Sequence, residues 1–504
     1  MTFEHSWLLK SEDETAALAR EFSLFATAGD WIGLSGDLGA GKTTFARALI
    51  RAYCSEPVDV PSPTFTLVQL YDETRIPVAH FDLYRLEEMS EADELGLDDL
   101  AGSHLILTEW AERLEDRLPP DRLMIDWQIS GEARTAKVTG FGVWQARLER
   151  MVRVARFVQD NAPGHAREFL QGDASARRYE RLIADDGQSS LLMDMPAKTE
   201  PKPADGSASY SQQVHLAEDI RAVLAVNKEL VAAGYSAPAI LAADIESGFA
   251  IVEDFGDAVF GTLENYGSKV TLPIKTAVEV LADMAGRNWP CTVGVDDQVH
   301  TMAAFDESAL MAEADLLMGW FWPLVTGTEP AADRHSEFTA LWQPLLQQVQ
   351  QEEPVWVMRD YHSPNLIWLD QREGNARVGI IDTQDAVLGS PAYDLAALLQ
   401  DARVDVSVAV ERKLLDHYAA CRRACDPSFD ETGFRTSYAI LGAQRAAKIL
   451  GIFARLSKRD GKHGYLRHIP RVSAILERNL QHSVLADLKT WFERYLPAPL
   501  REAV

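Results

Sequence analysis

The sequence lacks several features that mark specialised classes of protein. Its 504 residues contain no run of about 18 apolar residues, which argues against a membrane span. The N-terminus has no basic segment followed by an apolar one, so a secretory signal is not expected. Of only four cysteines, Cys421 and Cys425 alone lie close together, and no further cysteine or histidine completes a metal site. We therefore expect a cytoplasmic protein with reduced thiols.

Positive charge is also scarce in this chain. Lys and Arg number 49 against 76 Asp and Glu, so the formal net charge is -27. Such a chain repels phosphate backbones at long range, and we expect no strong direct binding to nucleic acid. If the protein acts on a nucleic acid, we expect a partner protein to bind that nucleic acid. Hydrophobic residues make up 47% of the chain, enough for two or three globular cores.

The order of expected elements divides the chain into two domains. In residues 1–148, short apolar strands alternate with helical segments, which predicts an α/β domain with a mostly parallel sheet and a late antiparallel edge. Residues 149–504 start again with a helix and strand pairs and continue mainly as helices. This pattern predicts a bilobal α+β domain, with a small lobe at about 155–256 and a helical lobe at about 257–504.

The stretch GDLGAGKTTF carries the first expected phosphate site. It matches G-x-x-x-x-G-K-[ST], in which glycines let successive backbone N–H groups point at a phosphate. A strand precedes this P-loop and a helix follows it, so the positive end of the helix dipole meets the same phosphate. We expect Lys42 to reach the β- and γ-phosphates of ATP, and the Thr43 hydroxyl to bind Mg²⁺. The expected ATP-binding residues are Gly36, Asp37, Leu38, Gly39, Ala40, Gly41, Lys42, Thr43 and Thr44.

Two acids end the next apolar strands, Asp82 in HFDLYR and Glu109 in LILTEW. Acids at the C-terminal ends of central strands lie beside the P-loop in this class of fold, so both are candidates for the metal or for orienting water. The segments GDLGAGKTTF, SPTFTLVQLY, HFDLYRL, ELGLDDL and LTEW, in this order, resemble the TsaE family. TsaE is the small ATPase of the bacterial system that makes threonylcarbamoyladenosine in tRNA.

The TsaE resemblance covers nearly all of residues 1–145 and implies roles for single residues. Thr43 and Glu109 would bind Mg²⁺, and Asp82 would serve hydrolysis. Thr15 and Arg134 match positions that approach the nucleotide in the family. The resemblance also implies partner subunits of the TsaB and TsaD type, because the family ATPase does not modify tRNA alone.

The stretches RDYHSPNLIWL and VGIIDTQDA predict a phosphoryl-transfer site of a different kind. Phosphoryl transfer to a hydroxyl needs a carboxylate near the acceptor proton and oxygen ligands that hold Mg²⁺ across the β- and γ-phosphates. We expect Asp360 to be the base, and Asn365 and Asp382 to be the metal ligands. Asp394 in YDLA is expected to brace the site. For Asp385 the sequence leaves both a metal-shell role and a structural role open.

This second half resembles the aminoglycoside-phosphotransferase-like kinases, and within them the AmgK-type anomeric kinases of N-acetylmuramate and N-acetylglucosamine. The resemblance rests on GDASARRYERL, LLMDMP, IVEDFGD, RDYHSPNLIWL and the segments that follow, over about residues 155–475. It implies that GDASARRY covers the nucleotide phosphates, and that VEDF, around Glu253, is the hinge whose backbone pairs with adenine. In two places the sequence departs from the family: Thr383 stands where an aromatic is usual, and LLMDMP offers no lysine. Arg177 or Arg178 would then grip the phosphates instead.

Three functions are compatible with these motifs. The first is an enzyme that uses ATP and Mg²⁺ twice, as an ATPase supporting tRNA modification and as a kinase of the anomeric hydroxyl of an amino sugar. The second keeps the kinase fold but gives it an aminoglycoside, choline or homoserine as acceptor. In the third, nucleotide sets the conformation of an assembly module without turnover. The complete set of Asp360, Asn365 and Asp382 favours catalysis in the second half.

Overall fold

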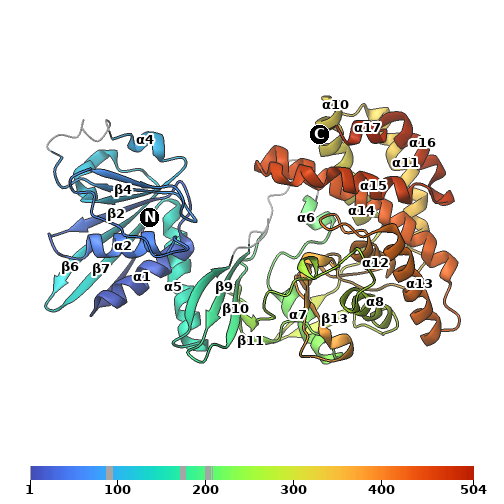
Figure 1. Ribbon diagram of the computed structural model, residues 1–504, viewed down its shortest axis with the longest axis horizontal. Coiled ribbons are helices and arrows are strands. Elements are labelled where there is room, and N and C mark those ends of the chain that lie inside the picture. The colour runs from blue at the N-terminus through green and yellow to red at the C-terminus, as the bar shows by residue number, and fades with distance from the viewer. Residues whose placement is uncertain (1, 87–94, 171–176, 199–205, 207, 504) are drawn as a thin grey trace. The chain divides into compact units, whose positions relative to one another are not determined.

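The computed structural model describes residues 2–86, 95–170, 177–198, 206 and 208–503 (Figure 1). The chain forms two compact units, Met1–Asp194 and Met195–Val504. The boundary expected near residue 148 falls inside helix α5 (Val143–Asn161), and the first unit continues beyond it. Among the described helices, none has the length and apolar character that a membrane span needs.

The first unit is built on a seven-stranded sheet in the order β1-β7-β6-β2-β5-β4-β3. Strands β4, β5, β2 and β6 run parallel, whereas β3, β7 and β1 add antiparallel edges at the two ends of the sheet. The sheet is therefore mixed, with the late antiparallel edge that the sequence predicts and a second one at β3. The strands are β1 (Phe3–Leu9), β2 (Trp31–Gly36), β3 (Val68–Tyr71), β4 (Val78–Asp82), β5 (Leu105–Glu109), β6 (Arg122–Ser130) and β7 (Ala133–Phe141).

Helices of the first unit follow from local signals. In α1 (Glu12–Phe25), the Ser11 side chain accepts a hydrogen bond from the Glu14 N–H, and three acids occupy the first turn, where they favour the positive end of the helix dipole. Figure 1 shows α1 and α2 (Lys42–Arg51) beside one another against the sheet. The short helix α4 spans Leu97–Leu100.

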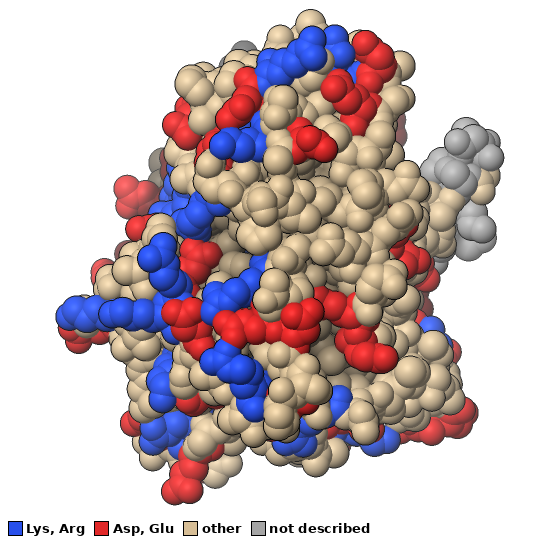
Figure 2. Space-filling view, turned by 90° about the vertical axis from the view of Figure 1, so that its right-hand side faces the viewer, with Lys and Arg blue, Asp and Glu red and all other residues tan. Residues whose placement is uncertain are grey.

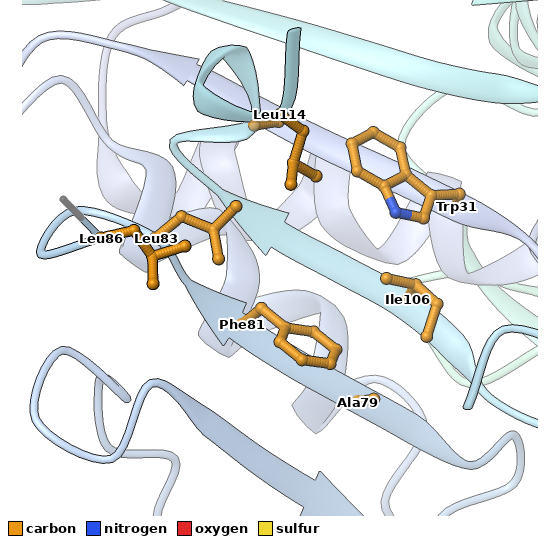
Figure 3. Packing of buried hydrophobic residues seen from close by; sticks show 8 residues of the cluster. Trp31, Ala79, Phe81, Leu83, Leu86, Ile106 and Leu114 are labelled. Atoms are coloured by element: carbon orange, nitrogen blue, oxygen red, sulfur yellow. The ribbon is translucent and has the colours of Figure 1, made fainter. Parts of the chain in front are cut away.

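The opposite face of the sheet carries a compact apolar cluster (Figure 3). Strands β4 and β5 are buried at every position, as expected for central strands covered on both faces. Phe81 of β4 and Ile106 of β5 lie beside Trp31 of β2, and Leu114 closes the cluster from a 3₁₀ helix at Ala111–Arg117. This packing fixes the strand ends that hold Asp82 and Glu109.

Three further strands complete the first unit after α5. Strands β8 (Ala166–Leu170), β9 (Arg178–Ile183) and β10 (Ser189–Asp194) pair antiparallel in sequence order. The β9–β10 hairpin is the strand pair that the sequence predicts in GDASARRYERL through LLMDMP. Residues 171–176 of the expected phosphate loop lie outside the described residues.

The second unit combines short strand pairs with a large helical part. The hairpin β11–β12 (Ile240–Asp244 and Phe249–Glu253) confirms the second expected strand pair. The hairpin β13–β14 (Thr292–Val295 and Gln298–Thr301) is not anticipated by the sequence analysis. Two small sheets interrupt the helices between residues 355 and 389. One pairs β15 (Val355–Val357) with β18 (Val387–Gly389), and the other pairs β16 (Leu366–Trp368) with β17 (Val378–Ile380).

Helices form the rest of the second unit. The longest, α14 (Glu431–Asp460), starts where the Asp430 carboxylate accepts the Gly433 N–H, and it ends at Gly461 with a φ of 66°. Nineteen of its residues are buried, so it is the central helix of this unit. The others are α6 (Tyr210–Gln213), α7 (Arg221–Ala232), α8 (Leu272–Met284), α9 (Glu307–Ala314), α10 (Trp322–Thr326), α11 (Ala332–Val349), α12 (Ala392–Leu399), α13 (Val408–Cys425), α15 (Ile469–Asn479), α16 (Ala486–Tyr495) and α17 (Ala498–Arg501).

Candidate active sites

The P-loop joins β2 to α2 through backbone conformations that only glycine adopts without strain. Gly36 has a φ of 119°, and a Cβ atom there would lie 2.2 Å from the Trp127 carbonyl oxygen. Gly41, with a φ of 121°, is the N-cap of α2. These glycines let the loop turn tightly against β6 and open the N-terminus of α2 toward the loop, the arrangement that cradles phosphate.

Lys42 curls back over the P-loop. Its Nζ donates hydrogen bonds to the carbonyl oxygens of Gly36 at 2.6 Å and Asp37 at 2.9 Å. The ammonium also lies 3.7 Å from the centre of the Trp110 ring. Burial lowers the pKa of Lys42, although Glu109 and other nearby acids oppose this effect. The side chain is thus held in the loop where the sequence places a phosphate contact.

Two hydroxyl–carboxylate pairs lie next to the P-loop. The Thr43 hydroxyl donates to Glu109 at 2.6 Å, and the Thr64 hydroxyl donates to Asp82 at 2.6 Å. Asp82 and Glu109 are directly opposite one another at the ends of β4 and β5. Their oxygens, with that of Thr43, are the hard ligands that Mg²⁺ prefers, so the donor set fits the expected metal.

His80 is a site residue that the sequence analysis missed. It is fully buried in β4, and its Nε2 lies 3.0 Å from the second carboxylate oxygen of Glu109. Glu109 is thereby held from one side by Thr43 and from the other by His80. The signal in the sequence is a histidine between the apolar residues of the strand VAHFD.

The remaining nucleotide contacts implied by resemblance stay predictions. Arg134 of β7 pairs with Ile129 of β6. Ile129 is two residues beyond Trp127, which lies opposite Gly36, so Arg134 is at the edge of the sheet that carries the P-loop. Thr15 is buried in α1, and its hydroxyl donates to the Ser11 carbonyl at 3.2 Å.

In the second unit, the structure brings together Asp360, Asn365 and Asp382. The Asn365 side-chain amide donates to the Asp360 carbonyl oxygen at 3.1 Å and lies 3.5 Å from an Asp382 carboxylate oxygen. Asp382 follows β17 with a φ of 63°, and Arg359 before the expected base has a φ of 65°. Such left-handed backbone at non-glycine residues is concentrated at functional sites. The amide and carboxylate oxygens again fit Mg²⁺.

Asp394 braces the loop that carries Asp360, as the sequence predicts. Its two carboxylate oxygens accept the N–H groups of Met358 at 2.6 Å and Arg359 at 2.9 Å. Burial raises the pKa of Asp394 to about 7. Both hydrogen bonds fix the left-handed turn at Arg359 and so determine the direction of the next residue, Asp360.

The charge of Asp360 is set by its surroundings. Burial alone would raise the pKa of its carboxyl, but positive charge from His362, Lys448 and Arg445 outweighs this effect and lowers the pKa to about 2. The His362 Nε2 lies 3.8 Å from the Asp360 carboxylate, and burial lowers the pKa of His362 to about 4. With a pKa of about 2, the Asp360 carboxyl is ionised at neutral pH.

A buried ionic cluster lies behind this loop and is absent from the sequence analysis. Glu313 of α9 is fully buried and pairs with Arg359 and with the Lys448 ammonium, the latter at 2.7 Å. The Tyr393 hydroxyl donates to the same carboxylate at 3.3 Å, and the Gln444 side chain also donates to it at 3.3 Å. The cluster connects α9, α12 and α14 to the loop that carries Asp360.

Thr383 and Asp385 both contact α7 or the segment before it. The buried Thr383 hydroxyl donates to the Asn227 side chain at 2.5 Å. One Asp385 oxygen accepts the Ala217 N–H at 2.7 Å. Thr383 thus has a structural partner, and Asp385 uses at least one oxygen structurally.

The expected hinge and the two arginines have partners of their own. Glu253 pairs with Arg372, and its N–H donates to the Ala239 carbonyl at 2.9 Å. Arg178 forms ion pairs with Asp194 and Glu180, so gripping phosphate would require it to leave them. The roles proposed for Glu253, Arg177 and Arg178 toward ATP stay predictions.

One face of the molecule carries charged side chains of both signs. On the face that Figure 2 draws, the described Lys and Arg side chains lie beside Asp and Glu rather than forming a continuous basic surface. This arrangement offers no extended track for a phosphate backbone on that face.

Comparisons with known proteins match the two halves separately. The family of the threonylcarbamoyl adenosine biosynthesis protein TsaE matches residues 9–137, and the phosphotransferase enzyme family matches residues 166–427. An N-acetylmuramate/N-acetylglucosamine kinase of Caulobacter vibrioides is 38% identical over 363 residues, or 70% of this chain and 98% of that protein. A kinase of the same name from Pseudomonas aeruginosa is 29% identical over 60% of this chain and 81% of its own. A tRNA threonylcarbamoyladenosine biosynthesis protein TsaE of Rickettsia felis is 38% identical over 25% of this chain and 73% of its own.

Proposed function

Because the chain belongs to the TsaE family in its first half and to the phosphotransferase enzyme family in its second, we propose that it joins two ATP-dependent activities. The second half phosphorylates the anomeric hydroxyl of N-acetylmuramate and N-acetylglucosamine, giving a sugar 1-phosphate. The first half hydrolyses ATP in support of threonylcarbamoyladenosine formation in tRNA, together with partner subunits of the TsaB and TsaD type.

The juxtaposition of Asp360, Asn365 and Asp382 carries the kinase proposal. Asn365 lies 3.1 Å from the Asp360 carbonyl oxygen and 3.5 Å from Asp382, so one loop and one strand end supply both a base and oxygen ligands. Asp360 accepts the proton of the sugar hydroxyl as that oxygen attacks the γ-phosphorus and ADP leaves. Asn365 and Asp382 would hold Mg²⁺, which would supply positive charge to offset that of the ATP phosphates.

Asp360 suits this role because it stays ionised. With a pKa of about 2, the Asp360 carboxylate is a weak base. It therefore accepts the proton of the sugar hydroxyl late in the reaction, when that oxygen is already bonding to phosphorus. Positioning and charge neutralisation therefore supply most of the rate enhancement. The bracing of Met358 and Arg359 by Asp394 provides that positioning.

The kinase proposal is tested with the full chain, Mg-ATP and a panel of acceptors. Phosphorus NMR should detect a 1-phosphate with N-acetylmuramate and N-acetylglucosamine. An aminoglycoside, choline and homoserine belong in the same panel, and preferential phosphorylation of one of them would replace the sugar assignment. Formation of a 6-phosphate instead of a 1-phosphate would also contradict it.

The ATPase proposal rests on Thr43, Glu109 and Asp82 around the P-loop. ATP hydrolysis by the full chain should rise when TsaB- and TsaD-type subunits are added, and Lys42→Ala should remove the stimulated part. Binding of ATP that promotes assembly without any turnover would identify the first half as a nucleotide-gated module instead.

A further inference from the structure

The first compact unit contains an interface between the P-loop domain and the strands that open the second family's region. Helix α1 belongs to the part matched by TsaE, and β8 and β9 belong to the part matched by the phosphotransferases. The last two turns of α1 contact β8, and both lie inside Met1–Asp194. The segments that match the two families are thus connected by helix α5 and also contact one another through α1 and β8.

An ion cluster is buried at this interface. Arg167 of β8 has a side chain only 6% exposed and pairs with Glu21 of α1 and, at 2.7 Å, with Glu180 of β9. Burial raises the pKa of Glu21 and works against its ionisation, while Arg167 opposes this effect. The described members balance as three cations and three carboxylates: Arg150, Arg167 and Arg178 with Glu21, Glu180 and Asp194.

Arg178 connects this cluster to α1. Its guanidinium lies 3.4 Å from the centre of the Phe25 ring and pairs with Asp194 at 3.0 Å. Phe25 is the last residue of α1 and is buried. Cation–π contacts of this kind are stronger where water is excluded. One face of the Arg178 guanidinium therefore lies on the P-loop domain, and its nitrogens form ion pairs with the kinase strands.

A second arginine joins the same surfaces. Arg75, between β3 and β4, donates from Nη2 to the Ser23 carbonyl of α1 at 2.6 Å. Its guanidinium also lies 4.0 Å from the centre of the Phe169 ring in β8. The P-loop domain thus contacts β8 from two directions, through α1 and through the β3–β4 turn.

We propose that the P-loop domain is a structural part of the kinase's nucleotide-binding half, and that Glu21 and Phe25 hold Arg167 and Arg178 in the orientation that ATP use by the kinase requires. Arg178 acts as a positioning residue at the start of β9, directly after the segment where the sequence predicts phosphate contacts. The proposal has a mechanical part, that α1 holds β8 and β9 in place, and a kinetic part, that this contact affects ATP use. Only the kinetic part rests on the proposed kinase function.

Hydrogen–deuterium exchange tests the mechanical part in the full chain. Phe25→Leu keeps an apolar side chain but removes the ring, and Glu21→Gln keeps the shape but removes the charge. Both should speed exchange in β8 and β9 as well as in α1. Arg156→Ala, at an exposed pair with Asp160, is the control and should change neither. Faster exchange confined to α1 would overturn the proposal.

Kinase kinetics test the consequence. In both variants the KM for ATP in sugar phosphorylation should rise about fivefold, with kcat at saturating ATP unchanged. An unchanged KM alongside altered exchange in β9 would show that the interface holds the strands without affecting ATP use, and would overturn the kinetic claim. If no acceptor is phosphorylated even by the unmodified chain, the proposed kinase function fails, and the exchange experiment still decides the mechanical claim.

Discussion

The Thr43 hydroxyl and the Glu109 carboxylate lie 2.6 Å apart although 66 residues separate them in the sequence. Thr43 is in the first turn of α2, and Glu109 is the last residue of β5. Strand β5 runs parallel to β2, so the end of β5 and the loop after β2 meet at one edge of the sheet. This pairing places a hydroxyl and a carboxylate where a nucleotide-bound Mg²⁺ would need them.

Changing Glu109 to Gln should weaken the metal site of the P-loop. The variant keeps the contact with Thr43 but loses the negative charge, and we expect Mg²⁺ affinity to fall about 10- to 100-fold, with ATP hydrolysis falling in parallel. Hydrolysis titrated with Mg²⁺ measures this. Thr43→Ser retains the hydroxyl and should behave like the unmodified chain; an equal loss in Thr43→Ser would show that shape, not metal binding, is the cause.

Asp360→Asn should abolish sugar phosphorylation while leaving ATP binding intact. Because the amide cannot accept the acceptor proton, we expect kcat to fall at least about 100-fold with little change in the KM for ATP. Stopped assays of sugar 1-phosphate provide the measurement. Asp370→Asn, at an exposed position in the loop after β16, is the matched control. Residual activity within a few-fold of the unmodified chain would exclude Asp360 as the base.

The kcat of the kinase should not fall near neutral pH because of protonation of Asp360. Asp360, with a pKa of about 2, is ionised throughout the working range. We therefore expect the Asp360-dependent part of kcat to stay level between about pH 5 and 8. A steady loss of kcat below about pH 7 that Asp360 variants abolish would contradict the low pKa.

Asp394 should make stability depend on pH in the opposite direction from an ordinary acid. Its pKa is raised by burial to about 7, so its contribution to stability is complete below the unfolded pKa of about 4 and is lost as pH rises through about 7. Asp394→Asn removes this titration. Chemical denaturation of both proteins across this range should show the unmodified chain losing stability relative to the variant as pH rises; a parallel pair of curves would contradict it.

Glu313→Gln should destabilise the second unit strongly. It leaves the buried charges of Arg359 and Lys448 uncompensated, and loss of one partner from a buried ion cluster costs about 3–5 kcal/mol. Denaturant unfolding followed by the signal of the second unit provides the measurement. Glu493→Gln, in an exposed pair with Lys489, should cost less than about 1 kcal/mol. Similar losses for the two variants would show that the Glu313 cluster carries no special stability.

Much of the fold was predictable because its signals are local. The glycine pattern before α2, the apolar runs of β4 and β5, and the strand pairs of β9–β10 and β11–β12 all show in short windows of sequence. The hairpin β13–β14 was missed because its strands are only four residues long, too short for a pattern of alternating apolar residues to stand out. Motif spacing also predicted that Asp360, Asn365 and Asp382 belong together, since they lie within 23 residues of one another, and the structure brings them into contact.

Residues that act from a distance could not be found in the same way. Glu313 is 46 residues from Arg359 and 135 from Lys448, and Glu21 is 146 residues from Arg167. In a linear sequence each is an ordinary acid on a helix. Their importance arises from burial, because only exclusion of water makes an unpaired charge costly and its partner necessary.

The sequence alone determined the chemistry available to this protein: a glycine loop with Lys42 and Thr43, and an acid–amide set around Asp360, both suited to nucleotide phosphates. The tertiary structure decided which groups hold those residues in place, such as His80 behind Glu109 and Asp394 beneath Asp360's loop. It also decided that α1 of one family packs on β8 and β9 of the other. The physical reason is that motif chemistry is encoded in neighbouring residues, whereas burial and charge pairing exist only once distant segments have folded together.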